Sequence, residues 1–431
     1  MCNGTIMDKL ISFSIPLMLS GILQLMFNAV DIVVVGRFSG SQALAAVGST
    51  TALINVFTNL FIGISLGANV LAARYYAAGK TKEMSETVHT AIALALVSGV
   101  AMAVIGVVFA RGALEIMGTP DDVIAKSTLY MRIYFCGMPF FMMYNYGAAI
   151  LRAVGDTKRP LIFLIVSGVI NAVLNLFLVI GFHLDVAGVG IATVISQLVS
   201  CILVLRCLHH TESSYQLHLA KLRIRSVYLK QIFEVGVPAG IQSTVINISN
   251  AMLQSSVNSF GSIAMAGYTA SNNIFGFLYV SVNSFTQACM SFTSQNYGVK
   301  KLKRMDRVLI DCMILSVVVT LILGSSVYIF GPELLHIYSN QADVIKYGME
   351  IFSYTTVTYF LCGLMDLFPG ALRGMGYSTV PMILSIIGTV GVRIIWIYGL
   401  FPSHRSLTFL FLSYPVSWIA TIIMQVICSC S

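Results

Sequence analysis

Long runs of apolar residues alternate with short polar and charged segments along nearly the whole chain. A helix that spans a bilayer needs roughly 20 mostly apolar residues. Breaks at Gly, Pro and charged residues divide the apolar runs into twelve such stretches. The predicted helices cover residues 10–36, 46–73, 87–110, 126–152, 160–181, 188–208, 232–257, 263–292, 308–330, 344–372, 380–400 and 406–430. The pattern therefore predicts an all-α polytopic membrane protein.

The composition supports this fold class. Of the 431 residues, 57% are hydrophobic and only 10% are charged, whereas a soluble domain carries about 25% charged residues. The net charge of +8 comes from short segments between apolar runs, so it indicates membrane topology rather than a nucleic-acid partner. The nine cysteines show no paired C-x-x-C spacing, which gives no support for a metal site or a disulfide framework. We expect no cofactor.

The basic residues predict how the chain is oriented. If the N-terminus is cytoplasmic, 18 of the 25 Lys and Arg residues fall in cytoplasmic loops and at inner helix ends, where the excess belongs. Seven fall at or toward the outer side: Arg37, Arg111, Lys126, Arg132, Lys346, Arg393 and Arg405. We expect both termini to be cytoplasmic in a plasma-membrane protein, with the lipid bilayer as a partner and a monomer as the assembly.

The two halves of the chain resemble each other at a nearly constant offset. Residues 151–155 match residues 372–376, and Pro160 matches Pro381. Several such matches in order indicate duplication. The predicted lobes are residues 1–208 and 231–431, joined by a cytoplasmic linker, 209–230. Because each half holds an even number of helices, we expect two six-helix bundles related by a pseudo-two-fold axis along the membrane normal.

Two acidic residues lie clearly within the apolar spans. Burying a charge at the centre of a membrane helix costs at least ~2.5–3.5 kcal/mol, so such residues point to function. Asp31 shares a helical face with Gln24 and Asn28. Its carboxylate could carry a proton or bind Na⁺ with neighbouring oxygens. Asp366 lies seven residues before Arg373, and there a functional and a structural role are equally open.

Amide and hydroxyl side chains occupy several other spans. Asn171 and Asn175 are spaced i,i+4 in the fifth helix, and Thr193 follows in the sixth. By spacing alone these residues would be packing contacts between helices. The seventh and eighth helices carry a long series of amides, which favours a watery cleft that admits many substrates. The candidate residues of this substrate cavity are Gln24, Asn28, Gln242, Asn247, Asn250, Gln254, Asn283, Gln287 and Asp366.

The chain resembles multidrug and toxic compound extrusion (MATE) transporters, on the bacterial branch nearer the DNA-damage-inducible type. The residues that carry the resemblance are Ile15-Pro16, residues 31–36, 43–48 and 151–157, and Val186-Ala187-Gly188 with Ala192-Thr193. It implies twelve helices in two lobes and export of cationic, amphiphilic compounds driven by H⁺ or Na⁺. It also implies a cation-coupling site at Asp31, Asn171, Asn175 and Thr193. Some relatives carry a coupling Glu at the position of Ile246, so the resemblance concentrates the coupling on Asp31.

Three other functions fit parts of the sequence. A flippase for lipid-linked precursors or polysaccharides would share the superfamily, although its cavity is typically cationic, whereas Asp31 and Asp366 make this interior acidic. A membrane enzyme acting on lipids could use His183 and Asp185. A scaffold or sensor would leave the polar residues within the spans unexplained. The sequence therefore predicts an antiporter for small molecules rather than an enzyme.

Overall fold

The computed structural model describes residues 1–430, apart from the side chains of Ser41, Ala52, Ser429 and Cys430. Within the described residues, all regular secondary structure is helical. The chain forms two compact units. The N-terminal unit comprises residues 19–237, and the C-terminal unit comprises residues 1–18 together with 238–431. These boundaries differ from the predicted lobes because two helices, Met7–Phe38 and Ser226–Asn258, are each divided between the two units.

Proline marks both divided helices. Helix α1 (Met7–Phe38) contains Pro16, and its first residues up to Met18 belong to the C-terminal unit. Helix α8 (Ser226–Asn258) contains Pro238, which is the first residue of that helix to belong to the C-terminal unit. A proline inside a helix removes one backbone hydrogen bond and favours a kink. The chain therefore passes from one unit to the other close to two weakened points.

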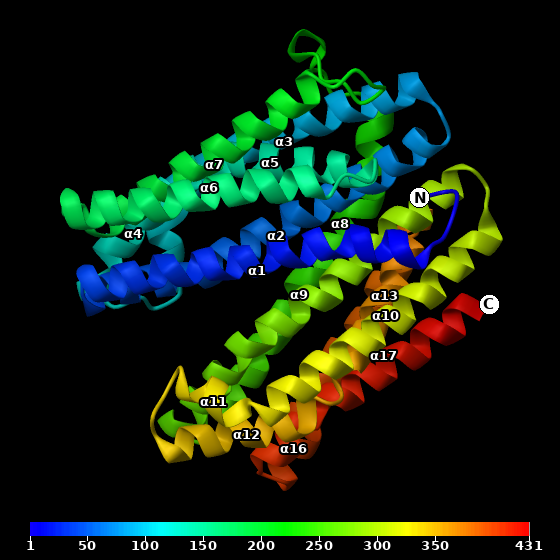
Figure 1. The fold of residues 1–431 in the computed structure, drawn as a ribbon. Coiled ribbons are helices and arrows are strands. Elements are labelled where there is room, and N and C mark those ends of the chain that lie inside the picture. Colours follow the sequence, from blue (N-terminus) through cyan, green and yellow to red (C-terminus); the bar gives the residue numbers. More distant parts are fainter. Residues whose placement is uncertain (431) are drawn as a thin grey trace. The chain divides into compact units, whose positions relative to one another are not determined.

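The N-terminal unit is a bundle of long helices, shown from blue to green in Figure 1. Helices α6 and α7 run side by side within it. Besides the later part of α1 and the beginning of α8, its helices are α2 (Ser41–Ala77), α3 (Thr81–Ile116), α4 (Asp121–Cys136), α5 (Met138–Ala153), α6 (Lys158–Leu176), the π-helical turn η1 (Phe177–Gly181), α7 (Asp185–His209) and the short 3₁₀ turn η2 (Leu219–Lys221).

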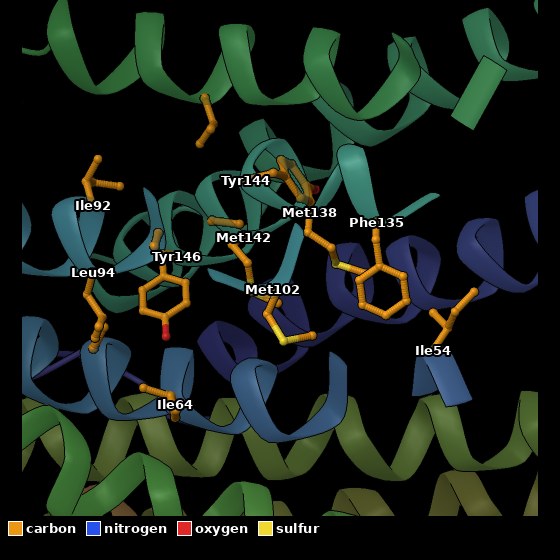
Figure 2. Packing of buried hydrophobic residues seen from close by; sticks show 14 of the residues in the cluster. Ile54, Ile64, Ile92, Leu94, Met102, Phe135, Met138, Met142, Tyr144 and Tyr146 are labelled. Carbon is orange, nitrogen blue, oxygen red and sulfur yellow. The ribbon is translucent and has the colours of Figure 1, made fainter. Parts of the chain in front are cut away.

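The core of the N-terminal unit lies between α2, α3, α4 and α5 (Figure 2). Met102, Phe135 and Met142 are buried there with at most 2% of their surface exposed. The same unit contains a close helix crossing at two glycines. A Cβ atom on Gly67 would lie 2.1 Å from the backbone oxygen of Ile232, and one on Gly236 would lie 2.5 Å from the Cα atom of Ile64. Glycine therefore permits α2 and α8 to touch backbone to backbone.

The C-terminal unit is a second set of helices, some of them divided into short segments. Besides residues 1–18 and the later part of α8, its helices are α9 (Ser262–Gly298), α10 (Leu302–Ile329), α11 (Gly331–His336), α12 (Ala342–Thr355), α13 (Tyr359–Met375), α14 (Thr379–Ser385), η3 (Ile386–Gly391), α15 (Val392–Ile394), η4 (Ile395–Leu400), η5 (Phe401–Ser403), α16 (Leu407–Phe411) and α17 (Ser413–Cys430). Residues of α1 pack here, where the rings of Phe13 and Phe292 meet edge to face with centroids 5.5 Å apart.

All twelve predicted spans are helical, but they differ in apolar character. Within residues 1–430, eight helices are long and apolar enough to cross a membrane, and a ninth results if α12 and α13, bent by 53°, form one span. The predicted span 126–152 is divided at Gly137 into α4 and α5 of 16 residues each. The other two, α8 and α9, carry the amide and hydroxyl side chains that lower their hydropathy.

Candidate functional site

Three helices of the N-terminal unit bring the predicted coupling residues together. Helix α1 carries Asp31, and α6 carries Asn171 and Asn175 one helical turn apart. Asn171 is 5% exposed and Asn175 is fully buried, because α6 packs this face against its neighbours in the unit. Helix α7 runs alongside α6 and supplies Thr193. The i,i+4 spacing thus places Asn175 beside the carboxylate and Asn171 next to Asn175.

A continuous series of hydrogen bonds joins these four side chains. The Asn175 amide nitrogen donates to the Asp31 carboxylate and also to the side-chain oxygen of Asn171, at 3.1 Å. The Asn171 amide nitrogen lies 3.5 Å from the Thr193 hydroxyl, which donates to the backbone oxygen of Val189 at 2.9 Å. The amide of Asn175 thus holds the Asp31 carboxylate of α1 against α6.

One polar atom of this network has no partner within the described residues. The side-chain oxygen of Asn175 is buried and accepts no hydrogen bond. A buried amide oxygen that lacks a donor costs roughly 1–3 kcal/mol. This oxygen lies on the same side chain that bonds Asp31. A donor or a cation bound there would therefore satisfy both the Asn175 oxygen and the Asp31 carboxylate. The arrangement can hold a proton on the carboxylate, or a monovalent cation between one carboxylate and neutral oxygens.

Two tyrosines of α4 also belong to this site, and the sequence reasoning missed them. Tyr130 and Tyr134 lie close enough to Asp31 to interact with its charge. Tyr130 is 6% exposed and is part of the core. The available signal was their i,i+4 spacing on one helical face. Each ring is apolar except at its hydroxyl, so the surroundings of the carboxylate include two mostly apolar side chains.

The predicted cavity residues on α1 stand apart from this network. Gln24 and Asn28 are exposed, and no hydrogen bond joins either side chain to Asp31 among the described residues. They share a helical face with Asp31, as the spacing predicted, and their exposure leaves them available to a ligand. Their role in binding substrate stays a prediction.

In the C-terminal unit, the predicted cavity residues divide between several partners. Arg373 donates to the Gln242 side chain at 2.6 Å, and both are more than 90% buried. Asp366 interacts with the charge of Arg373 and with the Tyr279 hydroxyl. The predicted proximity of Asp366 and Arg373 is therefore present, although the two side chains do not form a direct ion pair in the described structure. Gln242 thus accepts from a buried cation, and its role in binding substrate stays a prediction.

The remaining amides do not form one uniform stripe. Gln254 donates to Asn258 at 3.0 Å, one turn further along α8. Asn247 and Asn283 are exposed, and Gln287 is partly buried. Asn250 is exposed but accepts a hydrogen bond from Arg393 at 2.7 Å. Asn247 and Asn283 thus remain accessible enough to meet a substrate. Asn250, in contrast, is joined to a second buried arginine, Arg393.

Arg393 is a second buried arginine of the C-terminal unit. The charge pattern places it at or toward the outer side of the membrane, and the structure shows that it is 3% exposed. Its guanidinium contacts the hydroxyls of Ser417 at 3.3 Å and Ser249 at 3.4 Å. It also lies over the Tyr414 ring, 4.8 Å from the centroid. A count of basic residues along the sequence cannot distinguish an exposed loop arginine from a buried one that hydrogen-bonds to neighbouring helices.

The comparison with known proteins decides the family. The MatE family model matches residues 16–177 and again residues 238–398. The chain belongs to the MATE family. The first match begins at Pro16 and the second at Pro238, the two prolines that lie inside α1 and α8. This double match confirms the internal duplication that the sequence predicted, with the two halves in the predicted order.

MATE-family relatives cover almost the whole chain. A probable multidrug resistance protein of Bacillus subtilis, YoeA, is 30% identical over 389 residues, which are 89% of this chain and 84% of YoeA. The multidrug export protein MepA of Staphylococcus saprophyticus is 23% identical, covering 93% and 89%. A mutant of the Vibrio cholerae MATE transporter VcmN superposes with a TM-score of 0.91 at 19% identity, covering 98% and 95%. These matches confirm the recognised family and the predicted membrane fold of two helical bundles.

The family also bears on the predicted enzyme alternative. The family and its relatives are transporters, which agrees with a non-enzymatic interpretation. Asp185, half of the suggested catalytic pair, forms an ion pair of 2.6 Å with Lys126. Both His183 and Asp185 have positive φ angles, 55° and 53°. The pair therefore lies where the chain turns into α7, and Asp185, the first residue of α7, ties this point to α4.

Proposed function

We propose that this MATE-family protein is a secondary active antiporter that exports small cationic or amphiphilic compounds in exchange for H⁺ or Na⁺. The observation that carries the proposal is the hydrogen-bonded series from Asp31 through Asn175 and Asn171 to Thr193. A lone carboxylate among neutral donors inside a membrane bundle is typical of an ion pathway. The names of YoeA and MepA, a probable multidrug resistance protein and a multidrug export protein, supply the substrate class.

The proposed mechanism links the ion to α1. A cation or proton that enters from outside neutralises Asp31, which changes the hydrogen bonds that hold α1 against α6. Because α1 passes into the C-terminal unit close to Pro16, a change at Asp31 reaches the other unit along one helix. Release of the ion on the cytoplasmic side restores the bonded state. Linkage requires that ion and substrate each weaken the binding of the other by the same factor.

Flux in sealed proteoliposomes tests this proposal. The purified full chain is reconstituted with the cationic dye rhodamine 6G, and a Na⁺ gradient or a pH gradient is imposed separately. We expect dye movement against its own gradient under at least one of them, and the effective gradient identifies the coupling ion. Equal dye distribution under both gradients, in vesicles that hold each gradient, would contradict antiport.

In cells we place the protein in the plasma membrane with both termini cytoplasmic.

A further inference from the structure

The two units carry opposite charges at related places in the duplicated fold. At the offset that relates Pro16 to Pro238, Asn28 corresponds to Asn250 and Asp31 to Leu253. Leu253 is 1% exposed and apolar, so the C-terminal unit has no carboxylate at this place. From Pro238 to its end at Asn258, α8 carries no Asp or Glu and contributes neutral oxygens only.

The charge of the C-terminal unit comes from another helix of the same repeat. At the offset that relates Pro160 to Pro381, Thr193 corresponds to Tyr414. Thr193 accepts from the Asn171 amide in the first repeat, and Tyr414 lies under the Arg393 guanidinium in the second. Arg393 lies between two π-helical turns, η3 and η4, and π-helical turns occur frequently at functional sites. The second unit thus has a cation in the region where the first unit has an anion.

The polar contacts of Arg393 are all with neutral groups. They are the hydroxyls of Ser417 and Ser249, the amide oxygen of Asn250 and the Tyr414 ring. No carboxylate of the described residues lies within ion-pair distance. A buried charge without an opposite partner is unfavourable, and the second terminal nitrogen of the guanidinium makes no hydrogen bond within residues 1–430. Its neighbour Asn250 is exposed, so the polar group next to the cation is open to solutes.

We propose that Arg393 forms an anion-recognition site in the C-terminal unit that binds the carboxylate of a small-molecule substrate. The guanidinium is planar and always charged, and Asn250 and Ser417 hold two of its nitrogens while the N–H groups of the third donate to the carboxylate of the ligand. The proposal deepens the proposed transport function and rests on it: the compounds handled then include zwitterions and carboxylates in addition to simple cations. The acidic site at Asp31 would not by itself favour that class.

Two dyes that differ only at a carboxylate test this site by direct binding. Rhodamine B carries a free carboxylate, and its ethyl ester does not. Fluorescence anisotropy is measured with the purified full chain in neutral detergent, so that anionic lipid headgroups do not compete. We expect the wild type to bind rhodamine B about ten-fold more tightly than the ester, the size of one charge-assisted hydrogen bond. Arg393→Gln should abolish the preference, while its binding of the ester shows that the protein is folded.

A second variant keeps the test decisive if Arg393→Gln does not fold. Arg393→Lys retains the positive charge but loses the planar guanidinium that Asn250 and Ser417 hold in place, so the preference should fall to a few-fold. A wild type that binds the two dyes equally would overturn the proposal and leave Arg393 with a structural role. A preference that both variants retain in full would overturn it as well. Binding in detergent needs no gradient, so this failure is distinct from a failure of antiport, which the vesicle experiment alone reports.

Discussion

Asn175 donates its amide both to the Asp31 carboxylate and to the side-chain oxygen of Asn171. This single side chain therefore connects the acid of α1 to the amides of α6, and its own oxygen has no partner within the described residues. A residue in that position sets the geometry in which Asp31 meets an ion. The relationship divides the site into an ionisable group and a neutral amide that positions it.

Asn175→Ala should weaken ion coupling without removing the acid. The variant loses both hydrogen bonds, so Asp31 is less well fixed, and we expect the ion concentration for half-maximal dye efflux to rise several-fold. Efflux measured in proteoliposomes across a series of ion concentrations checks this. The control is Asn145→Ala, which removes only a bond within α5 to the Phe141 backbone oxygen, of 2.8 Å. An unchanged ion dependence in Asn175→Ala would show that the amide is only a packing contact.

Gly67→Ala should destabilise the N-terminal unit. The added Cβ atom would lie 2.1 Å from the backbone oxygen of Ile232, so α2 and α8 must separate, and overpacking of this kind costs typically about 1–3 kcal/mol. Thermal unfolding in detergent should show a transition several degrees lower than that of the wild type. Gly48→Ala is the matched control on the same helix, because a Cβ atom there meets nothing within 4 Å. Equal transitions for the two variants would disprove the close crossing.

Glu86→Ala should release the segment that joins α7 to α8. Glu86 accepts from Arg223 at 2.5 Å and from Arg225 at 3.2 Å, and both arginines are trypsin sites. Exposed ion pairs contribute little individually, but here two of them hold one loop. Limited trypsin digestion should cleave the variant several-fold faster at these arginines. Glu115→Ala, which breaks the exposed pair with Arg111, serves as control, and no difference in rate would mean that the loop is held elsewhere.

The sequence predicted the fold well because membrane spans leave a strong signal. A run of apolar residues must be helical in lipid, so the positions of all twelve helical regions could be predicted. It could not predict that residues 1–18 belong with the C-terminal unit. That division depends on the packing of the long helices. Neither Pro16 nor Pro238 alone shows to which unit the preceding segment belongs.

The site was predictable in its residue types but not in its contacts. A charge within an apolar span stands out, which singled out Asp31, and resemblance to the MATE family supplied Asn171, Asn175 and Thr193. Hydroxyl-bearing aromatic residues such as Tyr130 are common in membrane cores, so nothing in the sequence marked it. The burial of Arg393 could not be predicted either, because basic residues near the ends of spans usually indicate topology. Only three-dimensional packing shows that residues of α8 and α17 surround its guanidinium.

The central claim is that Asp31 couples an ion to export, and Asp31→Asn tests it most directly. The substitution removes the charge but keeps the size of the side chain. Dye efflux is measured in proteoliposomes under the gradient that drives the wild type, with the exposed Asp121→Asn as control. We predict that Asp31→Asn loses gradient-driven efflux by at least ten-fold, while Asp121→Asn stays at the wild-type rate. Efflux by Asp31→Asn at the wild-type rate would contradict the account.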